Sequence, residues 1–90
     1  MKQHNIKLSE KFCDAVFNGE KTFEVRVNDR HYAVGDLIKF IPINGQSKPW
    51  QHNIAEKLYY ITYLLDDCSE WGIQDGYVVF GIKPVHETEG

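Results

Sequence analysis

The sequence predicts an α+β domain dominated by β structure, with one helix near the N-terminus and about five strands around a single core. Two observations support this prediction. Apolar residues recur at helical spacing in only one segment, whereas residues 22–27, 58–65 and 77–82 are rich in β-branched and aromatic side chains. Strands this short around one core are typical of a small barrel, complete or incomplete.

The helix is expected over residues 10–17. Ser9 is a plausible N-cap, and Asn18-Gly19 ends the segment as a left-handed cap would. The apolar stripe of this segment consists of Leu8, Phe12, Cys13, Val16 and Phe17. A helix of this length needs a sheet to pack on, so the stripe is predicted to face the core.

Residues 22–27 alternate strictly between apolar and polar side chains, which indicates a half-buried strand. The apolar side chains expected to face the core are Phe23, Val25 and Val27. Glu24 and Arg26 are then expected on the opposite, polar face. A further strand follows Gly35-Asp36 and ends near Ile43, and His4 falls in an earlier one.

Strand patterns continue toward the C-terminus. Residues 58–65 and 77–82 are predicted strands, and Pro84 should end the last one. With 90 residues, the chain is below the usual size of one domain, so residues 1–90 are expected to form one unit. Residues 86–90 are read as a loose tail.

The N-terminal residues contain no apolar run of the length that a signal peptide needs, and no segment approaches a membrane span. A soluble, cytoplasmic protein with no membrane partner is therefore expected, with a monomer as the favoured state. Cys13 and Cys68 are too few for a disulfide framework and match no zinc spacing. Unpaired thiols are predicted, at least one of them in the core, and neither a metal nor a cofactor.

The net charge of −3 argues against a protein that coats duplex DNA by electrostatics alone. The charge is unevenly distributed along the chain. The first 40 residues hold seven Lys or Arg and six Asp or Glu, whereas the remainder holds three and seven. An anion-binding site is therefore expected in the first part of the chain.

Residues 19–26 place a lysine at a helix-to-strand corner, followed by a carboxylate and a guanidinium two residues apart. On one strand face Glu24 and Arg26 would lie about 7 Å apart. The carboxylate could accept from amino groups of a planar polar ligand, while Arg26 and Lys21 hold a carbonyl or phosphate. The alternative is a solvated face carrying a surface ion pair worth about 0 to 1 kcal/mol.

The same segment resembles the Gly-x-Lys-x-x-Glu-x-Arg signature of the ASCH domain, a member of the PUA-like superfamily. The residues that match the signature are Gly19, Lys21, Glu24 and Arg26. Flanking blocks that resemble a small bacterial and phage ASCH subfamily are His4-Asn5-Ile6-Lys7, Asn28-Asp29-Arg30, Val34-Gly35-Asp36, Ile61-Thr62-Tyr63-Leu64-Leu65 and Gly76-Tyr77-Val78-Val79. The resemblance extends over residues 4–82, nearly the whole chain.

The resemblance implies a PUA-like small β-barrel with an N-terminal helix, whose signature lines a cleft beside that helix and binds RNA or a nucleotide. A bacterial branch of the family hydrolyses the amide of 4-acetylcytidine with the motif lysine and a threonine. That threonine takes the place of Glu24 here, and Thr22 lies two residues earlier. The catalytic pair therefore does not carry over intact.

Four further residues are candidates for ligand contact. Asn28 and Arg30 continue the polar stretch, and Arg30 is a reasonable second phosphate contact, although the segment could equally cap a hairpin. His4 resembles the family's opening histidine and either reaches the cleft or is structural. Trp71, next to a glycine in a predicted loop, is the aromatic residue favoured for base stacking.

Three functions are compatible with these residues. The first is a binding module for single-stranded RNA, a nucleotide or a nucleoside, with Lys21, Glu24 and Arg26 in contact with ligand. The second is an amidohydrolase that deacylates a modified nucleoside, with Lys21 as base and Glu24 or Thr22 assisting. Glu24 would tend to keep Lys21 charged, which argues against the second function. The third is an adaptor with no small ligand.

Overall fold

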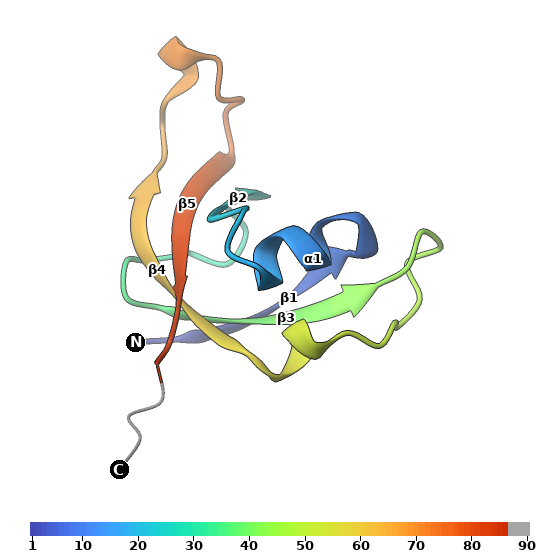
Figure 1. Ribbon diagram of the computed structural model, residues 1–90. Helices are drawn as coiled ribbons and strands as arrows, with labels where there is room; N and C mark the ends of the chain where they lie inside the picture. The colour runs from blue at the N-terminus through green and yellow to red at the C-terminus, as the bar shows by residue number, and fades with distance from the viewer. Residues whose placement is uncertain (87–90) are drawn as a thin grey trace.

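The computed structural model describes residues 1–86, and it has one short helix and a single curled sheet (Figure 1). The elements in chain order are β1 (Gln3–Ser9), α1 (Glu10–Phe17), β2 (Phe23–Val27), β3 (Leu37–Ile43), η1 (Asn53–Glu56), β4 (Leu58–Leu65), η2 (Ser69–Trp71) and β5 (Tyr77–Pro84), where η denotes a 3-10 helix. The predicted α+β, mainly-β fold is confirmed. Most of the predicted tail, residues 87–90, lies outside the described residues.

The five strands form one sheet in the order β1-β3-β4-β5-β2. β1 is parallel to β3, and the other neighbours are antiparallel. A register shift between Ile61 and Tyr63 marks a bulge in β4, and bulges bend a strand and increase its twist. The sheet therefore curls into a half-barrel in which β1 and β2 are the two unpaired edges. Figure 1 shows α1 lying across this opening, beside β1 and β2.

The core lies on the inner side of the curled sheet, and α1 covers part of it. The buried hydrophobic residues of this core are Ile6, Leu8, Cys13, Val16, Tyr32, Ile38, Phe40, Ile54, Tyr59, Ile61, Val78, Phe80 and Ile82. β5 continues to Pro84, two residues beyond its predicted end.

The helix follows the prediction at both ends. Ser9 occupies the N-cap position, although its side chain makes no capping hydrogen bond. At the C-terminal end, Gly19 takes the left-handed conformation with φ 79°, and its N–H donates to the carbonyl of Val16. The free thiols are also as predicted: Cys13 lies in the core and Cys68 is buried in the β4–β5 loop.

β2 alternates as predicted, but its two faces are the reverse of the prediction. Phe23, Val25 and Val27 are each about half exposed, whereas Glu24 is only 2% exposed. Glu24 pairs with the buried Phe80 of β5, so its side chain shares the inner face of the sheet. Because β2 is the edge strand, its inner face borders the opening of the half-barrel, where a charged side chain can find partners.

A histidine ties the segment after β3 to the helix. Nδ1 of His52 accepts a hydrogen bond from the backbone N–H of Ile54, so the ring proton lies on Nε2. Nε2 then donates to a carboxylate oxygen of Asp14 at 2.8 Å. The ring also lies edge-on to Phe17, so this contact and the buried Ile54 hold η1 against α1.

The N-terminal strand is anchored by a buried carboxylate, Asp36. It accepts hydrogen bonds from the Nε2 of His4 at 2.8 Å and from the backbone N–H groups of Lys2 and Ala33, both at 3.1 Å. His4 is 6% exposed and packs on the ring of Tyr32. Of the two alternatives for His4, these contacts favour the structural role, and His4 lines neither of the two cavities described below.

No helix among residues 1–86 is both long enough and apolar enough to cross a membrane.

Acidification should weaken the fold through Asp36. Burial raises the pKa of this carboxyl, but the hydrogen bonds from His4, Lys2 and Ala33 lower it by more. A carboxyl with a depressed pKa adds stability that is complete above its unfolded value of about 3.9 and is lost as the pH falls through the folded value. We expect Asp36→Asn to lower the free energy of unfolding at pH 7 by about 1 to 3 kcal/mol, because a buried donor loses its acceptor.

Urea denaturation at pH 7 and at pH 3 measures this effect. The difference in free energy of unfolding between wild type and Asp36→Asn should narrow at pH 3, because this pH lies below the unfolded pKa of about 3.9 and the contribution of the lowered native pKa is then being lost. Glu70→Gln, an exposed acid in η2, is the control and should change stability little at either pH. An equal loss at both pH values would contradict the ionic role of Asp36.

Candidate functional site

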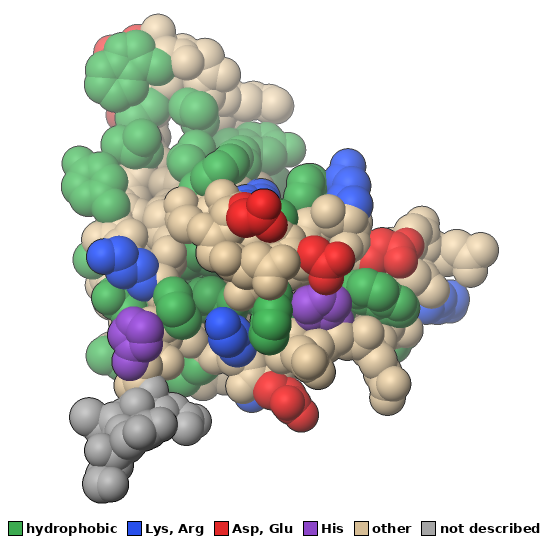
Figure 2. All heavy atoms as spheres, in the orientation of Figure 1, with side chains coloured by type: hydrophobic (Ala, Val, Ile, Leu, Met, Phe, Trp, Pro, Cys, Tyr) green, Lys and Arg blue, Asp and Glu red, His purple; other side chains and the backbone are tan. Residues whose placement is uncertain are grey.

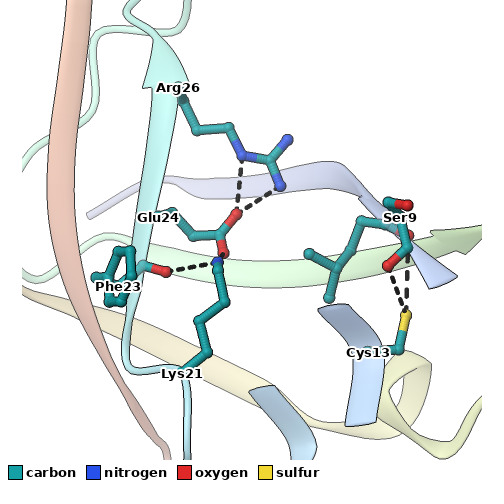
Figure 3. A network of polar contacts seen from close by, with 7 residues as sticks. Ser9, Cys13, Lys21, Phe23, Glu24 and Arg26 are labelled. Carbon is teal, nitrogen blue, oxygen red and sulfur yellow. Dashed lines mark hydrogen bonds and ion pairs between the residues drawn. The ribbon is translucent and has the colours of Figure 1, made fainter. Parts of the chain in front are cut away.

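The predicted motif lies where the chain passes from α1 into β2. Backbone N–H groups of Glu20 and Lys21 both donate to the carbonyl of Ala15, at 2.9 and 3.0 Å, which closes the turn against the last turn of the helix. The turn directs the side chain of Lys21 along β2. In Figure 3 it extends toward Glu24, while Glu24 and Arg26 project from β2 to the same side.

The three charged residues of the motif are in direct contact. One carboxylate oxygen of Glu24, Oε1, accepts from Nε and Nη2 of Arg26 at 2.9 and 2.7 Å. The other, Oε2, accepts from Nζ of Lys21, which also donates to the carbonyl of Phe23 at 2.7 Å. The Glu24 side chain is 3% exposed, against 18% for Lys21 and 23% for Arg26. These three residues are called the motif triad below.

Lys21 is held by aromatic rings as well as by the carboxylate. Its Nζ lies 5.0 Å from the ring centroid of Phe12 and 5.1 Å from that of Phe23, within the range of cation–π attraction. Phe12 was predicted to face the core, but it is 37% exposed. It lies one turn before Val16, where α1 extends beyond the core and borders the opening between β1 and β2.

A cavity of about 660 Å³ lies beside the motif triad. Its lining residues come from the end of β1, from α1, from the turn and from β2, and they are Lys7, Leu8, Ser9, Phe12, Glu20, Lys21, Phe23, Glu24, Val25 and Arg26. This first cavity combines two exposed aromatic rings with a charged group at its side. All of its lining residues belong to the first 40, the part of the chain in which the sequence predicts an anion site.

A second cavity, of about 560 Å³, continues from the first along the opening of the half-barrel. Lys7, Val25 and Arg26 line both. The remaining lining residues of the second cavity are Asn5, Ile6, Val27, Asp29, Arg30, Tyr32, Ile41 and Tyr77. Both sheet edges, β1 and β2, thus line two adjoining hollows, which are together called the groove below.

Tyr32 lines the second cavity with an aromatic ring that is held in place. Its ring packs between His4, at a centroid distance of 4.7 Å, and Phe80, at 4.9 Å. Burial raises the pKa of the Tyr32 hydroxyl, and the nearby charges of Arg26 and Arg30 oppose this rise without cancelling it. The hydroxyl is therefore protonated at neutral pH and is available as a hydrogen-bond donor.

The structure brings only part of the predicted site together. Lys21, Glu24 and Arg26 line the first cavity, and Arg30 lines the second. Asn28 is half-buried next to the groove but lines neither cavity, and its side-chain oxygen is buried without a hydrogen-bond partner among residues 1–86.

Two further predicted residues lie away from the groove. Thr22 lines a smaller hollow on the other side of Lys21, below the end of α1. Trp71 is 73% exposed in the β4–β5 loop, and it lines neither cavity. That loop projects from the body of the molecule (Figure 1), at an end where hydrophobic side chains gather on the visible face (Figure 2). The choice of Trp71 as the stacking residue is therefore not supported.

The sequence interpretation missed Lys7, Phe12 and Tyr32 as site residues. Lys7 alternates with buried neighbours in β1, and only the edge position of that strand brings it to the groove. Phe12 fits the apolar stripe of the helix, so periodicity alone assigns it to the core. Tyr32 follows a turn segment and carries no local signal. Among residues 1–86, no group of three His, Cys, Asp or Glu side chains is arranged to hold a metal ion.

Replacing Glu24 should destabilise the protein more than replacing an ordinary polar side chain on an edge strand would. Without the carboxylate, Lys21 and Arg26 lie side by side as like charges, so we expect Glu24→Ala to lower the free energy of unfolding by about 1 to 3 kcal/mol. Adding Arg26→Ala should restore part of the loss, giving a coupling energy of about 1 kcal/mol or more in a double-mutant cycle.

The same cycle on Asp29 and Arg30 is the control. These two side chains are well exposed and their charged atoms are 4.0 Å apart, so their coupling should be close to zero. Chemical denaturation of wild type and of the six variants, two single and one double in each cycle, measures both coupling energies. Strictly additive losses for Glu24 and Arg26 would contradict a coupled, inward-facing triad.

The chain was compared with known proteins. A family model described as "Domain of unknown function (DUF3850)" matches residues 3–82. No curated protein matches the chain. Among solved structures, the chain is similar to one titled "Crystal structure of hypothetical protein PH0355", with 17% identity, a TM-score of 0.59, and coverage of 94% of this chain and 100% of that one. At this identity the likeness shows the fold alone. The family match covers most of the sequence, and the chain therefore belongs to the DUF3850 family.

Proposed function

We propose that this protein is an ASCH-type binding module for a nucleotide or a short stretch of single-stranded RNA, held in the groove between β1 and β2. The observation that carries the proposal is the first cavity, in which two exposed aromatic rings, Phe12 and Phe23, lie beside a charged group. Bases stack on aromatic rings regardless of sequence, and a cation next to the stack can hold a carbonyl or phosphate oxygen.

Arg26 supplies the free donors for such a ligand. Its contacts with Glu24 use two of the five N–H groups of the guanidinium, and the others can be donated to ligand oxygens. The side chain is 23% exposed and borders both cavities. It is therefore fixed on one side by the protein and open to the groove on the other.

Glu24 acts in this proposal as a positioning residue. Its carboxylate already accepts three hydrogen bonds from Lys21 and Arg26, so little capacity is left to read the donor edge of a base. Its role is to fix the directions of the two cations. In this proposal Arg26 and the rings of Phe12 and Phe23 contact the ligand, in place of Glu24.

The charge balance favours a short ligand. The chain carries a net charge of −3, while the two cavities together are lined by four basic and three acidic side chains. A long polyanion would meet the acidic remainder of the surface, whereas a ligand confined to the groove would not. The proposal is thus a nucleotide or a few linked nucleotides.

A hydrolase receives less support from the geometry. A base at Lys21 would need a free amine, but its Nζ already donates to the Glu24 carboxylate and to the carbonyl of Phe23. Thr22, the nearest hydroxyl in sequence, lines a different hollow from Glu24. Among residues 1–86, Ser9 carries the one hydroxyl side chain that lines the first cavity, so it would have to act as the nucleophile or acid beside Lys21.

Base stacking on Phe12 is the most direct test. We expect wild-type protein to bind short single-stranded RNA of mixed sequence, and Phe12→Ala to weaken binding by about 5- to 150-fold, because one stacked base contributes about 1 to 3 kcal/mol. Isothermal titration calorimetry with a hexanucleotide provides the measurement. Trp71→Ala removes an exposed ring outside the groove, and it should bind like the wild type.

Two results would count against the proposal. One is an equal loss of affinity in Phe12→Ala and Trp71→Ala, since stacking would then not occur in the groove. The other is steady turnover of an acylated nucleoside such as 4-acetylcytidine, abolished by Lys21→Ala, which would make the protein an amidohydrolase. Thermal denaturation of each variant confirms that loss of affinity is not loss of fold.

A further inference from the structure

We propose that the second cavity is a phosphate subsite, so that the groove takes a phosphorylated nucleotide whose base lies in the first cavity and whose phosphate lies between Arg26, Arg30 and Tyr32. This inference rests on the proposed function, and it narrows the ligand from any nucleoside-like molecule to one with a phosphate. The phosphate is either the terminal group of a mononucleotide or an internucleotide linkage in RNA.

The charge of the second cavity differs from that of the first. Lys7, Arg26 and Arg30 line it together with a single carboxylate, that of Asp29. The first cavity has Lys7, Lys21 and Arg26 against two carboxylates, and Glu24 there is already paired. The excess of positive charge is therefore larger in the second cavity, although the protein as a whole is acidic.

Arg30 is available to an anion. Its nearest carboxylate is that of Asp29, with charged atoms 4.0 Å apart, and the two side chains are 48% and 68% exposed. An exposed pair at this distance contributes about 0 to 1 kcal/mol, so a phosphate can replace Asp29 as the partner of Arg30 at little cost. Guanidinium groups bind phosphate with two parallel hydrogen bonds, which strengthens the contact.

Tyr32 adds a donor whose position is fixed. Its ring is clamped between His4 and Phe80, and its hydroxyl feels the charges of both Arg26 and Arg30. A neutral phenol near two guanidinium groups can donate to a phosphate oxygen that the guanidiniums also contact. The subsite thus combines the exposed Arg30, the Arg26 guanidinium held by Glu24, and one rigid donor.

Arg26 joins the two cavities. It belongs to the motif triad and also lines the second cavity, together with Lys7 and Val25. The two hollows, about 660 and 560 Å³, follow one another along the open sheet edges, so a ligand that fills only the first leaves the cationic part of the groove unused. A base and its attached phosphate are the two chemically different parts that such a groove accommodates.

The test compares a nucleoside with its 5′-monophosphate and with a dinucleotide, by calorimetry on wild type, Arg30→Ala, Tyr32→Phe and the control Lys48→Ala. Lys48 is exposed in the loop after β3 and lines neither cavity, so Lys48→Ala changes the net charge equally without touching the subsite. We expect Arg30→Ala to weaken binding of both phosphorylated ligands about tenfold and to leave nucleoside binding unchanged.

The two phosphate sources give different patterns. Tighter binding of the monophosphate than of the dinucleotide indicates a terminal phosphate, and the reverse indicates an internucleotide linkage. Equal affinity of wild type for nucleoside and phosphorylated ligands, or equal effects of Arg30→Ala and Lys48→Ala, would overturn the subsite while leaving the proposed function intact.

An independent arm uses inorganic phosphate and NMR of the labelled protein. Phosphate should shift the amide signals of Arg30 and Tyr32 in wild type, with smaller shifts in Tyr32→Phe, and should leave those of η2 unchanged. If phosphate binds there but no nucleoside or nucleotide binds the groove, the subsite stands and the proposed function fails. If neither phosphate nor nucleotides bind, both are wrong.

Discussion

The buried carboxylate of Glu24, held between Lys21 and Arg26, is the interaction on which the arrangement of this molecule depends. An ionised carboxylate with 3% of its side chain exposed needs partners, and both come from the same short segment of chain. The turn after α1 supplies Lys21. β2 supplies Arg26, which follows Glu24 by two residues. Helix end, turn and edge strand are thereby joined at one point, and the first cavity lies against it.

The groove exists because the sheet does not close. β1 and β2 are far apart in the order of strands, and the bulge in β4 curls the sheet until these two edges face one another across a gap. In a closed barrel, inner-facing residues of both strands would be covered by core. Here Lys7, Arg26 and Tyr32 reach the gap from three different segments, and the helix supplies Phe12 as a further wall.

Local sequence patterns were sufficient to predict the single helix, the strands and the mainly-β class, because capping residues and strict alternation are properties of neighbouring residues. The same patterns identified Lys21, Glu24 and Arg26 as candidate site residues.

The side of β2 that faces inward could not be predicted, since the alternation of Phe23, Val25 and Val27 is the same whichever face is buried. The usual rule that apolar side chains face the core fails here because β2 is an edge strand whose charges neutralise one another. The partnership of His4 with Asp36 spans 32 residues of sequence and depends on strand pairing, which no local pattern reveals.

The exposed edge of β2 carries a risk that the motif triad reduces. Unpaired strands with apolar side chains invite pairing with another chain, and about half of the surface of Phe23, Val25 and Val27 is open to solvent. Charged side chains on the inner face of an edge strand oppose such pairing, because an added strand would cover them and remove their remaining contact with water. The half-barrel can therefore stay open along this edge without being prone to assemble edge to edge into aggregates.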